Sequence, residues 1–167
     1  VNVEGATIKA ISIARKLKKK TVLDIDFRPN LWGLSDHNDG ENRYIKSSEV
    51  TKKLQKNLRL FDLIVGTEEE FHIAGGINHT IKALKNVRSL TEAVLVCKRG
   101  PYGASIFENT IKSNLEKGIT GRNFKIEVFN VLGAGDGFMA GLLRGWLKNK
   151  NWETCLDFAN ACGAIAV

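Results

Sequence analysis

Short apolar strands alternate with amphipathic helical segments over the first hundred residues, and this alternation defines the fold class. Strand-like runs span residues 21–27, 63–65 and 93–97. Before and between them, apolar residues recur at the spacing of three and four that is typical of helices, over residues 6–18, 50–61 and 81–90. Nearly continuous apolar strands separated by helices are typical of a parallel sheet that is covered on both faces. The sequence therefore predicts an α/β fold.

In the second half of the chain, the predicted strands are short and are followed by two helices. Residues 104–107 and 124–129 have the pattern of strands, and we expect them to form hairpins at one edge of the sheet. Two helices are predicted after them, one beginning near Gly133 and one running from Trp152 towards the end. Ligands of open α/β sheets bind beyond the carboxyl ends of the strands, so the residues that follow each strand are the candidates for function.

Composition excludes several classes of protein. The chain has 167 residues, of which 43% are hydrophobic and 26% charged, which argues against disorder. No apolar run approaches the roughly 20 residues of a membrane span. The chain begins without Met and ends in an apolar run, so we interpret it as an internal piece of a longer protein. Cys97, Cys155 and Cys162 include no CxxC pair, which argues against a zinc site or disulfide framework and fits a reducing cytoplasm.

The formal net charge of +7 permits acidic partners such as a nucleotide, a phosphosugar or a nucleic acid. The densest basic run, residues 16–20, follows a helical pattern and is explained by a solvated helix end. No aromatic residues interleave with it, as a groove for single-stranded nucleic acid would require. We therefore expect no nucleic-acid partner.

The strongest candidate site is the glycine-rich segment 130–141, which follows a predicted strand and opens a helix. Gly133 and Gly135 allow a sharp turn and a close backbone approach to a ligand. The first amides of the helix then form an anion site, and Asp136 beside it can take a proton from an acceptor hydroxyl. The alternative is a helix cap, because Asp favours the first turn of any helix.

The Gly-Ala-Gly-Asp core at 133–136, with Ala140 and Gly141 in the next turn, resembles the signature of the PfkB, or ribokinase-like, carbohydrate kinases. The resemblance implies a three-layer α/β/α sandwich with a mainly parallel sheet, and a reaction that uses ATP and Mg²⁺. It also implies that Asp136 is the catalytic base and that Gly133, Ala134 and Gly135 form the anion hole. The N-terminal region and the β lid of the family lie outside residues 1–167. We therefore expect this chain to be the nucleotide-binding and catalytic part of one kinase domain, inactive in isolation.

A second segment, 24–32, is similar to a run of the ketodeoxygluconate-type kinases of that family. With Asp at position 26, followed by Gly33 and by Gly-Thr-Glu-Glu-Glu at residues 66–70, the chain resembles the branch that phosphorylates 5-dehydro-2-deoxygluconate. Asp24 and Asp26 are expected on one face of their strand. Arg28 can bind a phosphate or a sugar acid, and Asp26 and Arg28 are the candidates for that contact. The alternative is a local Asp–Arg pair that holds a turn.

Residues 67–70 read Thr-x-x-Glu, which is the pattern of a helical capping box. The same residues fall on a family motif that organises magnesium and phosphates through water. The resemblance therefore implies that Glu70 contributes to a magnesium site through water, whereas the local pattern predicts only a helix cap.

The loop 98–103 and the final helix supply the remaining candidates. Lys98, Gly100 and Gly103 match the family's nucleotide loop, and a two-glycine hairpin turn is the alternative. Asn160 falls on a helix that lines the adenine pocket in the family, and core packing is the alternative there.

Taken with the resemblance, these segments predict a cytoplasmic sugar-acid kinase of inositol catabolism. It would convert 5-dehydro-2-deoxy-D-gluconate to its 6-phosphate by transfer to a primary hydroxyl. The alternatives are another PfkB sugar kinase, such as a ketodeoxygluconate kinase or a fructokinase, a non-catalytic nucleotide-binding module, or a basic nucleic-acid binder. The expected partners are ATP and a small sugar acid, with no membrane, and a homodimer is left open.

Overall fold

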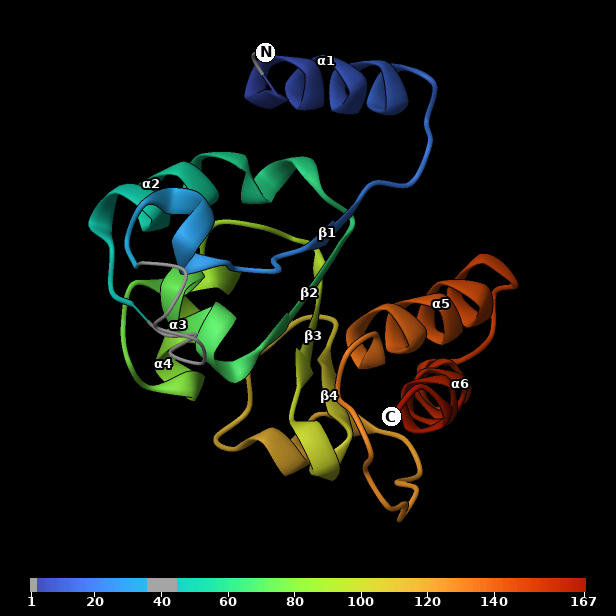
Figure 1. Cartoon of the computed structure of the whole chain (residues 1–167). Coiled ribbons are helices and arrows are strands. Elements are labelled where there is room, and N and C mark those ends of the chain that lie inside the picture. Colours follow the sequence, from blue (N-terminus) through green and yellow to red (C-terminus); the bar gives the residue numbers. More distant parts are fainter. Residues whose placement is uncertain (1–2, 36–44) are drawn as a thin grey trace. The chain divides into compact units, whose positions relative to one another are not determined.

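The computed structural model describes residues 3–35 and 45–167 (Figure 1). Packing divides the chain into two compact units. The first unit runs to Val96 and includes Glu108–Ile111, and the second comprises Cys97–Phe107 and Lys112–Val167. The assignment of residues 1–167 to one kinase domain stays a prediction, and each unit is described separately below.

Helices and strands follow one another largely as the sequence predicts. The α-helices are α1 (Val3–Lys16), α2 (Ser48–Asn57), α3 (Glu68–Gly75), α4 (Thr80–Arg88), α5 (Ala134–Leu147) and α6 (Trp152–Ile165). The strands are β1 (Val22–Asp24), β2 (Leu63–Thr67), β3 (Val94–Lys98), β4 (Ala104–Phe107) and β5 (Ile119–Thr120). Short 3-10 helices are η1 (Pro29–Trp32), η2 (Leu58–Leu60), η3 (Gly100–Tyr102) and η4 (Leu115–Lys117). None of the helices between residues 3 and 35 or 45 and 167 is long and apolar enough to cross a membrane.

The strands of the described residues form one sheet in the order β1-β2-β3-β4-β5. β1 and β2 are parallel, with Val22 opposite Leu63. β4 and β5 are antiparallel, with Ser105 opposite Thr120. The predicted α/β class is therefore confirmed, and the sheet is mixed. β3 begins in the first unit and ends in the second.

The core of the first unit explains the unbroken apolar run of β2. Leu63, Ile64 and Val65 are fully buried, and α3 and α4 pack Phe71 and Leu84 into the same core. A strand covered in this way needs apolar side chains on both of its faces, which is why the run does not alternate. The apolar stripe predicted over residues 6–18 does not face the core. Ile13 and Leu17 of that stripe are exposed, and Ile11 is the buried residue of α1.

The second unit is built on the pair α5 and α6, which lie side by side (Figure 1). Gly137, Gly141 and Gly145 share one face of α5 because they are four residues apart. A Cβ on Gly145 would lie 2.8 Å from Cys155 Sγ, and a Cβ on Gly137 would lie 2.8 Å from the Cys162 carbonyl oxygen. The two helices therefore approach so closely that this face of α5 has no room for side chains.

The predicted strand at 124–129 is wrong, since the chain there has no regular structure. Phe124 and Ile126 are each 45% exposed, and the strand that pairs with β4 is β5. Just after β5, the backbone N–H of Arg122 donates to Asp157 Oδ1 (2.7 Å), which ties the chain to α6. Alternating side chains form a strand only where a neighbour offers backbone hydrogen bonds, and this segment leaves the sheet edge before reaching one.

Candidate active site

The N-terminus of α5 has the geometry that the glycine-rich segment predicts. Gly133 is the N-cap and has φ 86°, a left-handed conformation that glycine adopts without a Cβ clash. The N–H of Ala134 donates to the Val131 carbonyl (3.3 Å), so it is engaged in the turn. The N–H groups of Gly135 and Asp136 belong to the first helical turn, which has no preceding carbonyl in the helix to bond. With the positive end of the helix dipole, these two amides can bind an anion.

Asp136 is the third residue of α5, and it is exposed. The turn that leads to it is held locally by Asn130, whose Oδ1 accepts a hydrogen bond from the Leu132 N–H (2.9 Å). The N–H groups of Phe129 and Asn130 both donate to the Val167 carbonyl, at 2.8 and 3.2 Å. Asn130 therefore shapes the entry to the helix that carries Asp136.

Lys98 reaches the same place from another element of the second unit. It is the last residue of β3, and a Cβ placed on Gly135 would lie 3.9 Å from its Nζ. The structure thus brings a residue of the predicted nucleotide loop to the first turn of α5. No local pattern could reveal this approach, because Lys98 and Gly135 lie far apart in the sequence.

The loop between β3 and β4 is a tight turn, as its two glycines predict. The N–H of Arg99 donates to the Gly103 carbonyl (2.8 Å), and the N–H of Gly103 donates to the Gly100 carbonyl (3.0 Å). Arg99 also pairs with Glu116 at 2.7 Å. The Glu116 backbone amide and Arg99 hold the pKa of that carboxyl below its ordinary value. The loop is therefore fixed at its base, while its role in binding nucleotide stays a prediction.

Asn160 of α6 lies beside this loop and is only 8% exposed. Its Nδ2 donates to the Arg122 carbonyl (2.7 Å), and a Cβ on Gly103 would lie 3.0 Å from that nitrogen. Within the described part of the chain, its Oδ1 is buried without a hydrogen-bond partner. A buried acceptor of this kind needs a donor from a ligand or from water, so Asn160 can contribute to binding as well as to packing.

Sequence reasoning missed a pair of hydrogen bonds, between Arg122 and Asp157, that lies next to Asn160. Asp157 accepts two hydrogen bonds from Arg122, from the backbone N–H (2.7 Å) and from Nε (3.0 Å). A Cβ on Gly121 would lie 2.6 Å from Leu156 Cβ, so the chain touches α6 directly there. The only sign of this contact in the sequence is an arginine and an aspartate that lie far apart. Such pairs are too common to predict a contact.

Asp26 and Arg28 lie in the first unit, after β1. The strand ends at Asp24 rather than Phe27, and Asp26 has φ 37°, so the expectation that Asp24 and Asp26 share a strand face is wrong. A left-handed residue breaks the alternation on which that expectation rests. Asp26 Oδ1 and Arg28 Nε are 3.0 Å apart, and both side chains are 61% exposed. The local ion pair that the sequence allows is present, and it stands in open solvent.

Glu70 closes a complete capping box at the start of α3. The Glu70 N–H donates to Thr67 Oγ1 (3.3 Å), and the Thr67 N–H donates to Glu70 Oε2 (2.7 Å). Its other oxygen, Oε1, accepts a hydrogen bond from the Phe27 N–H (3.2 Å). The structure therefore brings Glu70 against the segment that carries Asp26 and Arg28. Residues 3–35 and 45–167 contain no group of three His, Cys, Asp or Glu side chains that could hold a metal ion.

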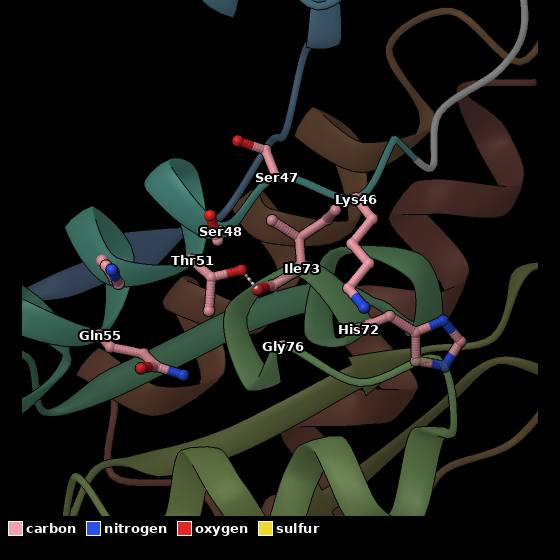
Figure 2. A pocket seen from close by; sticks show the side chains of 9 residues that line it. Lys46, Ser47, Ser48, Thr51, Gln55, His72, Ile73 and Gly76 are labelled. Carbon is pink, nitrogen blue, oxygen red and sulfur yellow. Dashed lines mark hydrogen bonds between the residues drawn. The ribbon is translucent and has the colours of Figure 1, made fainter.

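A separate pocket in the first unit, of about 220 Å³, contains none of the predicted site residues (Figure 2). It lies where α2 meets the C-terminal end of α3. There Thr51 Oγ1 donates to the Ile73 carbonyl (2.7 Å), as the dashed line in Figure 2 shows. Burial lowers the pKa of His72 in its wall, which favours the neutral ring. Its lining is Lys46, Ser47, Ser48, Thr51, Lys52, Gln55, His72, Ile73 and Gly76.

A helix N-terminus with a lysine and an aspartate close to it, on a mixed α/β sheet, is an arrangement that can bind a phosphate group. The sequence model of the pfkB family carbohydrate kinases matches residues 31–167. The chain belongs to this family of kinases.

Two curated relatives are both named 5-dehydro-2-deoxygluconokinase. The protein of Bacillus licheniformis is 25% identical, and that of Listeria monocytogenes is 26% identical. In each case the match spans 97% of this chain and 45% of the relative. The chain thus spans about half the length of the curated relatives it matches.

Solved structures share the fold. A fructokinase from Vibrio cholerae with bound fructose, ADP and calcium matches 97% of this chain and 49% of its own, with a TM-score of 0.72 and 23% identity. An aminoimidazole riboside kinase from Salmonella enterica, in complex with aminoimidazole riboside and an ATP analogue, matches 97% of this chain and 50% of its own. Its TM-score is 0.70 and its identity 21%. The ribokinase-like fold expected from the sequence is confirmed.

Proposed function

We propose that this chain is the phosphate-binding and catalytic half of an ATP-dependent sugar-acid kinase. The substrate we propose is 5-dehydro-2-deoxy-D-gluconate, which would be phosphorylated on its 6-hydroxyl. The observation that carries the proposal is the start of α5, where Asp136 follows the left-handed Gly133 and Lys98 lies beside Gly135. The names of the relatives support the choice of substrate. Within the described residues Cys97, Cys155 and Cys162 form no disulfide, which supports a cytoplasmic location.

In the proposed reaction, Asp136 accepts the proton of the sugar hydroxyl as the bond from that oxygen to the γ-phosphorus forms. The bond from phosphorus to the bridging oxygen of ATP breaks, and its electron pair remains on ADP. The N–H groups of Gly135 and Asp136 stabilise the negative charge of the transferred group. Such preorganised donors are the largest contribution expected in phosphoryl transfer. Gly133 and Ala134 shape the turn that presents these donors.

For the nucleotide, we propose the loop at Lys98, Gly100 and Gly103 together with Asn160. The turn is held rigidly at Arg99 and leaves Gly100 with no atom within 4 Å of a Cβ position. The buried, unpaired Oδ1 of Asn160 can accept a hydrogen bond from a donor of the nucleotide.

A magnesium ion fits this chain only through water and phosphate oxygens. Both oxygens of Glu70 already accept backbone hydrogen bonds, from Thr67 and Phe27. An ionised carboxylate has lone pairs left for a bound water, so Glu70 can hold the hydration shell of an ion. The ion would supply charge neutralisation of the phosphates.

The first test of the proposal is ADP formation by the full-length gene product. We expect ADP release to depend on 5-dehydro-2-deoxygluconate, with a kcat of about 1–100 s⁻¹ as in other kinases. Equal or faster release with 2-keto-3-deoxygluconate or fructose would instead identify another sugar kinase of the family. If none of these sugars causes ADP release, the proposed function is contradicted. The 167 residues alone are expected to turn over poorly, because transfer requires both reactants to be held in line.

A second prediction concerns Arg28, whose guanidinium is exposed beside Asp26. Arg28→Ala in the full-length gene product should raise KM for the sugar acid about tenfold, because a charged hydrogen bond to its carboxylate is lost. The matched control is Arg59→Ala, which removes an exposed arginine of η2 in the same unit. Steady-state kinetics with an acidic and a neutral sugar decide the matter. An equal loss for both sugars would show that Arg28 only holds its turn or contacts ATP.

A further inference from the structure

A side chain, rather than backbone, ends the parallel pairing of β1 and β2. Ile25, the residue after β1, still continues the pairing, because its N–H donates to the Val65 carbonyl (2.9 Å). In a regular parallel ladder the next donor would be the Phe27 N–H, and its acceptor would be the Thr67 carbonyl. That N–H donates instead to Glu70 Oε1 (3.2 Å). A carboxylate of α3 therefore takes the place of a backbone acceptor of the sheet.

The same carboxylate also takes the donor from the other strand. Regular pairing would direct the Thr67 N–H to the Ile25 carbonyl, but it donates to Glu70 Oε2 (2.7 Å). Gly66 leaves room for this arrangement, since a Cβ there would lie 2.9 Å from Ile25 Cδ1 and 3.3 Å from Glu70 Oε2. The two oxygens of Glu70 thus bind one donor from each strand end and tie the two ends to each other.

The turn that leaves the ladder is strained at Asp26. This residue has φ 37°, in the left-handed region that residues other than glycine seldom adopt. Ile25 and Phe27, on either side of it, are buried. Backbone strain of this kind persists only where the surroundings hold it. The bond from the Phe27 N–H to Glu70 comes directly after the strained residue and holds the turn there.

The turn determines where Arg28 stands. Its Nε donates to Asp26 Oδ1 (3.0 Å), and both side chains are exposed. A guanidinium has five N–H donors, and this bond uses the one on Nε. The donors on the two terminal nitrogens can bind a carboxylate through two parallel hydrogen bonds. Glu70 therefore influences the direction of these donors through the backbone of Phe27.

Resting on the proposed function, we propose that Glu70 is a positioning residue for the sugar-acid site. Its carboxylate holds the strained turn at Asp26 and thereby directs Arg28 to the carboxylate of the substrate. The role forms and breaks no covalent bond. It differs from a part in magnesium binding, because it depends on the two backbone hydrogen bonds of Glu70 and acts on the sugar rather than on the phosphates.

Glu70→Gln in the full-length gene product tests this role at saturating Mg²⁺. A glutamine side chain has one acceptor oxygen, so it can serve the N–H of Thr67 or of Phe27 but not both. We expect KM for 5-dehydro-2-deoxygluconate to rise about three- to tenfold, and KM for ATP to change less than about twofold. The matched control is Glu69→Gln, which removes an exposed carboxylate from the same helical turn and should change neither value.

A double variant shows whether Glu70 acts through Arg28. When Arg28→Ala is already present, Glu70→Gln should raise KM for the sugar acid no further, because the group that Glu70 positions is gone. If the two effects multiply, Glu70 acts on something else and the proposal is overturned. The proposal also fails if Arg28→Ala alone leaves this KM unchanged.

Hydrogen exchange of the Phe27 amide, followed by NMR, gives a readout that needs no turnover. In Glu70→Ala, which removes both acceptor oxygens, we expect this exchange to become about tenfold faster or more, and in Glu69→Gln to stay as it is. An unchanged rate in Glu70→Ala would show that the bond does not hold the turn, and that result would overturn the proposal.

The kinetic outcomes separate Glu70 from the proposed function. If the unaltered protein phosphorylates the sugar acid and Glu70→Gln matches its KM, the positioning role is wrong and the kinase assignment stands. A raised requirement for Mg²⁺ with an unchanged KM for the sugar acid would show that Glu70 serves the metal ion instead. If the unaltered protein transfers phosphate to none of the sugars, both proposals fail.

Discussion

Asp136→Asn in the full-length gene product is expected to lower kcat by about 10²–10⁴-fold, the usual contribution of a general base. The amide keeps the size of the carboxylate but cannot accept the hydroxyl proton. Because the N–H groups of Gly135 and Asp136 are unchanged, ATP should bind about as well as before. Single-turnover kinetics with ATP and the sugar acid would measure the chemical step directly.

The control for Asp136 is Glu153→Gln, which removes an exposed acidic residue from the first turn of α6. It reproduces the charge loss near a helix N-terminus at a position with no proposed chemistry, so kcat should stay within about twofold. Retention of more than roughly a tenth of kcat by Asp136→Asn would rule out this residue as the base.

Gly141→Ala should destabilise the chain, although helix propensity predicts the opposite. Alanine is favoured over glycine within a helix by about 1 kcal/mol. At position 141, however, the new Cβ would lie 2.8 Å from Ala159 Cα and against the Phe158 carbonyl oxygen. Backbone atoms cannot rotate away as a side chain can, so α5 and α6 must separate. Overpacking of this kind typically costs about 1–3 kcal/mol in the free energy of unfolding.

Urea denaturation of Gly141→Ala and of a matched variant would decide between propensity and packing. Gly163→Ala adds the same methyl group to α6, where its nearest neighbour would be the Ala134 carbonyl oxygen at an ordinary 3.4 Å. We expect Gly163→Ala to be neutral or stabilising and Gly141→Ala to be destabilising. A Gly141→Ala protein as stable as the original would show that the two helices are not closely packed at this glycine.

Local patterns predict most of the helices and strands and the candidate base. The strand at 104–107 and the helix from Trp152 have the bounds or the start that their apolar patterns indicate. Thr67 caps α3 because the capping box involves only residues 67–70. Asp136 is found in the same way, since a glycine turn followed by an acidic residue needs only its neighbours to be recognised. These features depend on contacts within one helical turn or one hairpin, and such contacts can be read along the chain.

Contacts between residues far apart in the sequence account for two features that the patterns did not predict. Phe124–Phe129 alternates like a strand, but no strand of the sheet pairs with it, because Asp157 draws Arg122 onto α6. Lys98 reads as part of a hairpin turn, and only the packing of α5 in the second unit brings it to Gly135. A residue's own neighbours specify its backbone conformation, whereas its distant partners depend on how sheet and helices fill space together. For this reason the sequence identifies the candidate site residues, and the packed structure shows which of them lie close together.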